Sequence, residues 1–248
     1  MRPMEMPVWI AFAGLVLVIA LATDHIVDAG QPPSAPTADI VYRPPPVGRP
    51  GGRVGGSTRS GSRPLEQDPV ALDVLVPEGH IGLTGQEQPS LYWYLSKSTT
   101  HPIEVTIIDD RAVQPLLETR VGTPIQPGVH RVRLADYGVR LSTGVVYRWS
   151  VALVVDPDDR AKDILASGPI ERIVLPEALR AKLAGAGAAQ APQLYAAAGI
   201  WYDALTALSD LLDAAPYDPA LRRQRASLLQ QVGLPEIAAH DLRHSRGD

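Results

Sequence analysis

The sequence predicts an all-β plus α chain, in which an antiparallel β-sandwich is followed by a small helical tail. Short apolar runs separated by proline and glycine fill the middle of the chain, and the apolar period becomes helical after Leu175. A pattern that recurs after 34 residues supports the helical tail. We expect an apolar N-terminal segment at 1–22, a linker at 23–65, the sandwich at 66–175 and the helical region at 176–248.

The apolar run from Val8 to Ala22 predicts export. Arg2 precedes the run, and Ala20 and Ala22 form the small-x-small pattern that signal peptidase accepts, so we expect cleavage after Ala22. The run is shorter than the ~20 apolar residues of a typical spanning helix. A cleaved signal predicts a periplasmic or secreted protein. The alternative is an uncleaved inner-membrane anchor, in which this segment alone touches the membrane.

Residues 23–65 are rich in proline and glycine and poor in aromatic side chains. Such a segment buries too little apolar surface to offset its conformational entropy, so it is predicted to be a disordered linker. Its arginines leave two interpretations open, a solvated linker or an electrostatic contact with an anionic lipid, polymer or nucleic acid. These arginines are Arg43, Arg49, Arg53, Arg59 and Arg63.

The composition excludes several kinds of site. The chain has no cysteine, which excludes disulfides, thiolate metal sites and cysteine nucleophiles. Its net charge of -4 gives no reason to expect nucleic acid as a partner, and no aromatic residue lies among Arg49, Arg53, Arg59 and Arg63 for base stacking. The glycines of 51–56 lack the lysine and the following helix of a phosphate-binding loop, so we expect no nucleotide cofactor.

The middle of the chain contains regularly spaced strand patterns. Alternating apolar and polar residues, or short apolar runs, are bounded by turn residues, with no intervening helix. These features predict an antiparallel sandwich. The expected strands are 70–76, 91–95, 103–108, 129–134, 145–155 and 170–175.

Two aromatic residues refine this prediction. Trp93 lies in an early strand, where a sandwich often buries an aromatic ring between its sheets. The segment from Leu141 to Trp149 resembles a tyrosine corner, in which the Tyr147 hydroxyl reaches back to upstream backbone. The region therefore resembles fibronectin type III and immunoglobulin-like (Ig-like) sandwiches. This resemblance implies an architecture and no chemistry.

The helical region contains an internal repeat. Its first copy has Tyr195, Gly199, Ile200, Ala204 and Leu208, and the second, 34 residues later, has Leu229, Gly233, Leu234, Ala238 and Leu242. The region resembles tetratricopeptide repeats, which have this period. The pattern predicts helices near 188–198, 200–214, 219–232 and 235–244, with Asp218 as an N-cap. Two repeats are too few for a free solenoid, so we expect the tail to pack on the sandwich or on a partner.

Four segments follow the apolar N-terminal run in a fixed order, at 51–59, 91–94, 141–149 and 199–205. Gly199 to Ala204 is the most specific of them. This order is similar to that of a bacterial exported family called domain of unknown function 928. The resemblance covers residues from about 50 to 240, implies an exported protein and implies no activity.

Acidic residues are the main candidates for catalysis or metal binding. Asp109 and Asp110 follow a predicted strand, and Asp156, Asp158 and Asp159 form a cluster. Carboxylates can bind Ca²⁺ or act as an acid and base. The cluster lacks the closing glutamate of a calcium loop, so ordinary turns explain both groups. A hydrolase would need a pocket that joins these carboxylates to a histidine.

His240 and His244 are spaced to share one helix face, as in a zinc site. No third ligand is evident, and a polar helix end explains the pair equally well. Without a nucleophile and base in a recognised pattern, we expect no enzyme activity, no metal and no cofactor.

The leading functional hypothesis is a protein-binding or scaffolding module whose partner is another envelope protein. Tyr195, Trp201 and Tyr202 are the candidate partner-binding residues. Of these, Tyr202 is expected to be exposed and Trp201 to pack between the helices. The alternative is a module that binds carbohydrate or an envelope polymer, if sandwich aromatics face water. The rings concerned are Tyr92, Trp93, Tyr94, Tyr147 and Trp149. Exposed coplanar rings would favour sugar, and a groove at Tyr195 and Tyr202 would favour protein.

Overall fold

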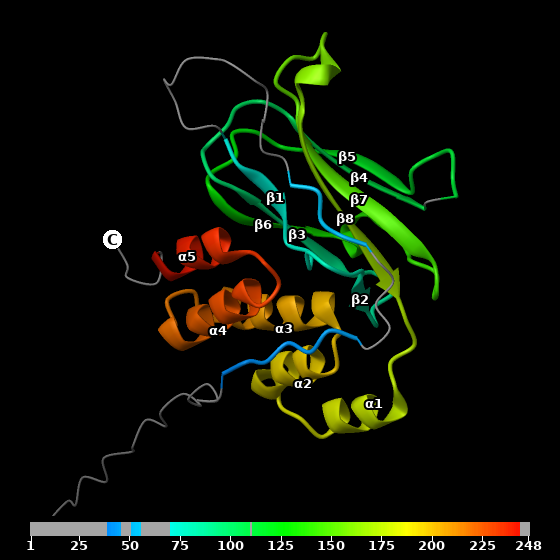
Figure 1. Cartoon of the computed structure of the whole chain (residues 1–248), viewed down its shortest axis with the longest axis vertical. Helices are drawn as coiled ribbons and strands as arrows, with labels where there is room; N and C mark the ends of the chain where they lie inside the picture. The colour runs from blue at the N-terminus through cyan, green and yellow to red at the C-terminus, as the bar shows by residue number, and fades with distance from the viewer. Residues whose placement is uncertain (1–38, 46–50, 56–69, 110, 244–248) are drawn as a thin grey trace, which may run out of the picture. The chain divides into compact units, whose positions relative to one another are not determined.

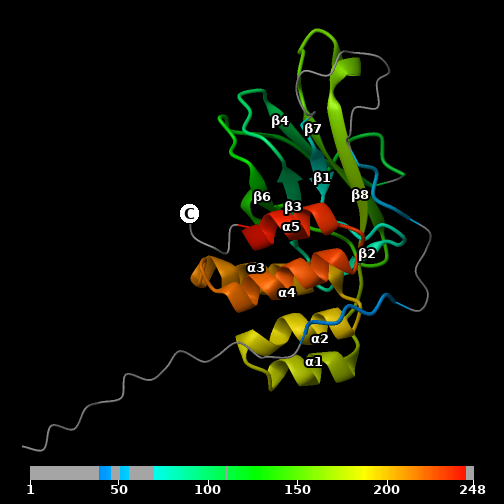
Figure 2. The same cartoon turned by 60° about the vertical axis from the view of Figure 1, so that its left-hand side comes forward.

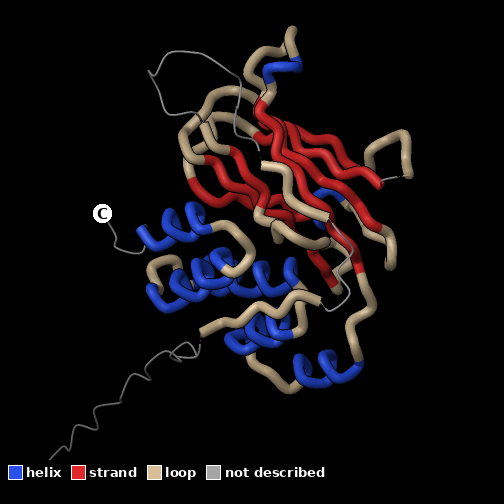
Figure 3. Tube along the Cα trace, in the orientation of Figure 1, coloured by secondary structure: helices blue, strands red, loops and turns tan. Residues whose placement is uncertain are grey.

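The computed structural model describes residues 39–45, 51–55, 70–109 and 111–243, all within one compact unit, Ala35–Asp248 (Figure 1). The apolar run and the predicted cleavage residues Ala20 and Ala22 lie outside the described residues. Among the residues described, no helix has the length and apolar character needed to cross a membrane. The fold belongs to the β plus α class, because two sheets precede five α-helices (Figure 3).

The strands form two sheets, with the orders β1-β3-β6 and β2-β8-β7-β4-β5. Neighbouring strands are antiparallel except β2 and β8, which pair in parallel. The prediction of purely antiparallel sheets is therefore wrong at this edge. The long chain between β2 and β8 permits a parallel crossover, which a short hairpin would not. The strands are β1 (Leu72–Val74), β2 (Gly82–Thr84), β3 (Ser90–Leu95), β4 (Ile103–Asp109), β5 (Leu117–Val121), β6 (Gly128–Arg133), β7 (Val146–Leu153) and β8 (Ile164–Arg172).

The core lies where the sheets meet each other and the helices. In β7, buried Tyr147, Trp149, Val151 and Leu153 alternate with more exposed residues, as expected for a strand with one face in the core. Every residue of β3 is buried, because helices lie over the face that the other sheet does not cover. Trp93 in β3 is 1% exposed, which confirms its predicted burial.

The predicted tyrosine corner is confirmed. The backbone N–H of Ser142 donates to the Tyr147 hydroxyl at 3.0 Å, and the Tyr147 side chain is buried. The bond joins the start of β7 to the loop before it, so it fixes the path by which the chain enters the larger sheet.

The helices form two hairpins, α2–α3 and α4–α5, and α1 lies farthest from the sheets (Figure 2). The 34-residue repeat has a structural counterpart, because each hairpin turns at a left-handed glycine, Gly199 (φ +75°) or Gly233 (φ +81°). In both turns the next N–H bonds a carbonyl five residues back, from Ile200 to Tyr195 and from Leu234 to Leu229. The helices are α1 (Glu177–Ala184), α2 (Ala191–Ala197), α3 (Trp201–Ala214), α4 (Pro219–Gln230) and α5 (Pro235–Arg243).

The predicted N-cap at Asp218 is also confirmed. Its carboxylate accepts hydrogen bonds from the N–H groups of Ala220 at 2.7 Å and Leu221 at 3.2 Å. Pro219 follows at the first helical position, where its missing N–H leaves no intrahelical bond unmade. These two residues explain why α4 begins where it does.

Two stretches of the predicted linker belong to the folded unit. Ile40 and Tyr42 are 1% and 6% exposed, and Val54 exchanges two backbone hydrogen bonds with Ser167 of β8. The prediction of a disordered linker is therefore wrong for residues 39–45 and 51–55. Alternate buried side chains and backbone bonds hold residues 39–45 against the rest of the chain, and backbone bonds of Val54 together with the Arg53 side chain hold residues 51–55.

We predict that Tyr147→Phe lowers the free energy of unfolding by about 1 kcal/mol, because the Ser142 N–H loses its acceptor while the ring remains. Tyr217→Phe is the matched control, since Tyr217 is 78% exposed. Urea denaturation measures both variants. Equal midpoints for Tyr147→Phe and the wild type would contradict the role of the corner.

We also predict that Gly199→Ala destabilises the fold more than Gly233→Ala. Both residues have positive φ, a strain of about 1–2 kcal/mol for a residue with a Cβ. A Cβ at residue 199 would lie 2.7 Å from the Arg43 carbonyl oxygen, which is backbone, whereas at residue 233 it would meet the flexible end of Glu78. Thermal denaturation measures the melting temperature of each variant. Equal decreases for both variants would show that crowding by the Arg43 carbonyl does not contribute to the loss of stability.

Candidate functional site

The first two residues of α3 attach the helices to the sheets. Trp201 Nε1 donates a hydrogen bond to the carbonyl oxygen of Leu75 at 2.8 Å. The Tyr202 hydroxyl accepts from Trp149 Nε1 at 2.8 Å and donates to the carbonyl oxygen of Pro169 at 3.0 Å. Both side chains are 0% exposed, so the buried polar groups that they introduce are paired.

The expectation that Tyr202 is an exposed contact residue is therefore wrong. Trp201 and Tyr202 are completely buried, and their polar atoms bond the sheet region instead of a partner. Only Tyr195, at the end of α2, keeps part of its ring accessible among the three predicted partner-binding residues.

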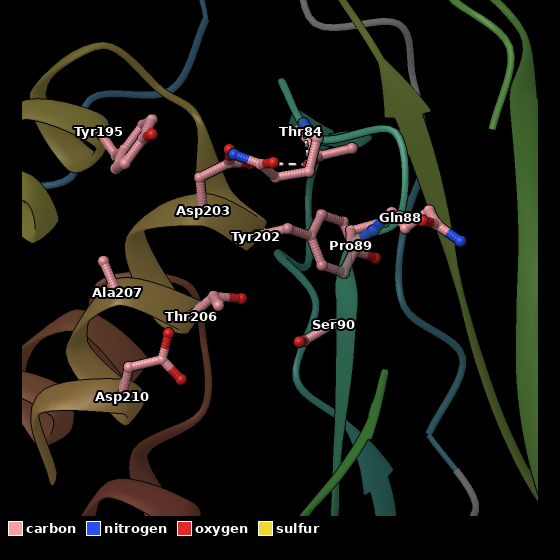
Figure 4. Close-up of a pocket in the computed structure, with 11 residues that line it drawn as sticks. Thr84, Gln88, Pro89, Ser90, Tyr195, Tyr202, Asp203, Thr206, Ala207 and Asp210 are labelled. Carbon is pink, nitrogen blue, oxygen red and sulfur yellow. Dashed lines mark hydrogen bonds between the residues drawn. The ribbon is translucent and has the colours of Figure 1, made fainter. Parts of the chain in front are cut away.

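Beside Tyr202 lies a cleft of about 350 Å³ between α2, α3 and the chain that joins β2 to β3 (Figure 4). Tyr195 forms one wall, and the side chains of α3 form another. The opposite wall comes from the β2–β3 connection, so the cleft exists because the helices are attached to this part of the sheets. Its lining residues are Thr84, Gln86, Gln88, Pro89, Ser90, Tyr195, Tyr202, Asp203, Thr206, Ala207 and Asp210.

Asp203 is the most unusual residue of the cleft. Its Oδ2 accepts hydrogen bonds from Thr84 Oγ1 at 2.7 Å and from the Gly85 N–H at 3.1 Å, shown in part in Figure 4. Its Oδ1 is buried and has no well-formed hydrogen bond among the described residues. The Gln86 side chain interacts with both Asp203 and Tyr195. Burial raises the pKa of Asp203, and the bonds from Thr84 and Gly85 oppose that rise only in part.

The chemistry of the cleft is polar and contains little unpaired charge. Asp210, seven residues after Asp203 on the same helix, forms an ion pair with Arg131 at 2.6 Å. Arginine, lysine and histidine are absent from the described lining, so it offers no cation to a phosphate. Amides and hydroxyls remain, and these are groups that recognise neutral polar ligands or peptide backbone.

Sequence reasoning singled out neither Asp203 nor the residues before β3 as parts of a site. Asp203 lies inside the most specific element of the family resemblance, Gly199 to Ala204, which was the available signal. No sequence pattern indicates that Thr84 and Gln86 belong to the site, because the segment that contains them is separated from Asp203 of α3 by about 118 residues along the chain.

The other candidate residues have structural partners or lie outside the described residues. Asp109 Oδ1 accepts from the Arg111 N–H at 2.9 Å, and Asp156 pairs with Lys162 at 2.7 Å. His240 lies against the Tyr94 ring with centroids 5.1 Å apart. Within the described ranges, histidines and acidic residues form no group of three that could hold a metal. Asp110 and His244 lie outside those ranges.

The condition for sugar binding by sandwich aromatics is not met, because all five rings are buried. The most accessible, Tyr94, is 8% exposed and Trp149 is 0% exposed. Tyr147 serves the corner and Trp149 bonds Tyr202, so these rings hold the fold together and offer no platform to a sugar.

We predict that Asp203 makes the stability of the fold depend on pH. The pKa of Asp203 in the folded state lies above the unfolded value of 3.8. At a pH between these two pKa values, the folded chain therefore holds a proton that the unfolded chain has lost. Stability contributed by this residue therefore falls as pH rises through that window. Urea denaturation from about pH 4 to about pH 8 should show the wild type losing stability relative to Asp203→Asn. A constant difference would contradict the assignment.

Comparison with known proteins adds a family. No curated protein matches the chain. A solved structure, the crystal structure of a multi-domain immunophilin from Arabidopsis thaliana, aligns with 9% identity over 71% of this chain and 93% of that chain, at a TM-score of 0.20. The family model of Domain of Unknown Function (DUF928) matches residues 54–242, and the chain belongs to this family.

Proposed function

We propose that the protein is a bacterial exported scaffolding module without catalytic activity, and that the cleft at Tyr195 binds a segment of another envelope protein. The observation that supports this most is the cleft itself, about 350 Å³ in volume and lined by amides and hydroxyls around one accessible ring. Export rests on the apolar run at 8–22 and on the family resemblance.

A protein segment suits this cleft better than a nucleotide or a sulfated or phosphorylated polymer. The lining includes the hydroxyl of Thr206 and the side-chain amides of Gln86 and Gln88, groups that both donate and accept. Each amide also has a partner within the fold, since Gln86 interacts with Asp203 and Gln88 Nε2 donates to the Val139 carbonyl at 3.2 Å. Tyr195 supplies a large ring with little conformational freedom, the kind of residue that contributes most to protein interfaces. Charge plays a small part, because Asp210 is already paired with Arg131.

The finer description of the fold belongs to the same proposal. The tyrosine corner and the buried Trp93 support an Ig-like arrangement of the two sheets. The two glycine turns, 34 residues apart, support tetratricopeptide-like hairpins. Both architectures serve mainly for binding, which is an analogy at the level of fold.

The test is site-specific photo-crosslinking in the envelope. A benzophenone amino acid at Thr206, inside the cleft, should capture a protein that the same group at exposed Tyr217 does not. The captured protein is then purified, and its dissociation constant is measured for three forms of the full chain. Tyr195→Ala should weaken binding about tenfold or more, and Tyr217→Ala should leave it unchanged.

Equal capture at both positions, or equal affinity of all three forms, would overturn the proposed site. A crosslinked product that contains sugar and no second protein would show that the partner is an envelope polymer and not a protein. Circular dichroism of each variant shows that a loss of binding is not a loss of fold.

A further inference from the structure

A segment from the N-terminal part of the chain lies in a groove between the two helical hairpins. Residues 39–45, called the strap from here on, cross between α2 and α4 (blue in Figure 1). The Arg43 N–H donates to the carbonyl oxygen of Ala196 at 3.0 Å, and Tyr42 and Ile40 bond Gln231, which directly follows α4. The strap thus bonds the first hairpin at Ala196 and the end of α4 at Gln231, in addition to the direct packing of α3 against α4.

The strap is held as an extended peptide ligand is held. Ile40 and Tyr42 point inward and are 1% and 6% exposed, whereas Val41 between them is 53% exposed. The side-chain amide of Gln231 contacts both ends of this pair, because its Oε1 accepts from the Tyr42 N–H and its Nε2 donates to the Ile40 carbonyl, each at 2.9 Å. These bonds recognise the backbone, so the two buried side chains alone determine sequence preference.

Tyr42 is the residue that fits a specific pocket. Its ring packs edge-on against Trp201, with centroids 5.3 Å apart, and stacks on the His80 ring at 5.7 Å. Its hydroxyl lies 2.7 Å from His80 Nε2. Burial raises the pKa of Tyr42 and lowers that of His80, so both changes favour the uncharged forms of this hydrogen-bonded pair.

The family model matches the residues that form the groove but does not match the strap that occupies it. His80, Ala196, Trp201 and Gln231 all lie within residues 54–242, which the family model matches, and the strap lies before that range. The groove is thus built by the family domain, and a segment from outside the matched domain occupies it.

We propose that this groove is a peptide-binding site, occupied by the strap of the same chain, in which the strap competes with an extended segment of a partner protein. The partner segment carries an aliphatic residue and, two positions later, a tyrosine, as Ile40 and Tyr42 do. This site is distinct from the cleft at Tyr195, and it does not depend on the function proposed there.

The test uses a fluorescent peptide with the sequence of residues 37–46 and the full chain in mild detergent. Tyr42→Ala in the protein weakens the strap and leaves the groove residues unchanged. Fluorescence polarisation should show peptide binding to this variant, and at least about tenfold weaker apparent binding to the wild type, where the strap occupies the site. A peptide with alanine in place of the tyrosine is the matched control and should not bind.

A groove variant gives a second, independent readout. Gln231→Ala, added to Tyr42→Ala, removes both backbone bonds and should weaken peptide binding about fivefold or more. Absence of binding to a folded Tyr42→Ala chain, or binding that ignores Gln231, would overturn the proposal. Copies that exchange labelled N-terminal segments to form dimers would also overturn it, and would assign the groove to a second copy.

Native-state hydrogen exchange tests the wild type without any substitution. A displaceable strap requires that the Tyr42 and Arg43 amides exchange through local opening, at least about tenfold faster than the amides of β7. Exchange of these amides only by global unfolding would show that the strap is a fixed part of the fold, and would overturn the proposal even if Tyr42→Ala failed to fold.

Discussion

The attachment of α3 to the sheets through three consecutive residues is the constraint on which the rest of the structure depends. Successive side chains of a helix point about 100° apart, so they can all be buried only where the helix end is inserted among other elements. Trp201 bonds the backbone after β1, Tyr202 bonds β7 and β8, and Asp203 bonds β2. The pairing of these polar groups matters because an unpaired one costs roughly 1–3 kcal/mol in such surroundings.

This attachment also determines where the cleft lies. Once the beginning of α3 is fixed, α2 must fold back over it at the Gly199 turn, and the space between α2, α3 and the β2–β3 connection becomes the cleft. The second hairpin repeats the same turn at Gly233, and the strap bonds both Ala196 of α2 and Gln231 after α4. The cleft and the position of the strap therefore both result from packing two similar hairpins on one pair of sheets.

The sequence predicts local features well and long-range ones poorly. The corner at Tyr147 and the cap at Asp218 depend on neighbours within five residues, so their patterns are visible in the sequence. The sequence did not predict β2 or β5. Strand β2 has only three residues, and in β5, at a sheet edge, exposed charged residues mask the alternation of apolar and polar side chains. Tyr202 looked suitable for a surface because its bonding partner Trp149 lies 53 residues away. The linker prediction averaged over 43 residues and so missed the Ile40 and Tyr42 alternation.

The strap and the cleft both contact the start of α3, at Trp201 and at Tyr202 respectively. The strap packs its Tyr42 ring on the edge of Trp201, while Tyr202 and Asp203 form the floor of the cleft. Both indole and phenol are held by hydrogen bonds to Leu75, Trp149 and Pro169 that involve neither occupant. If the two proposals hold, a segment can enter the cleft or replace the strap while these hydrogen bonds keep the start of α3 in place.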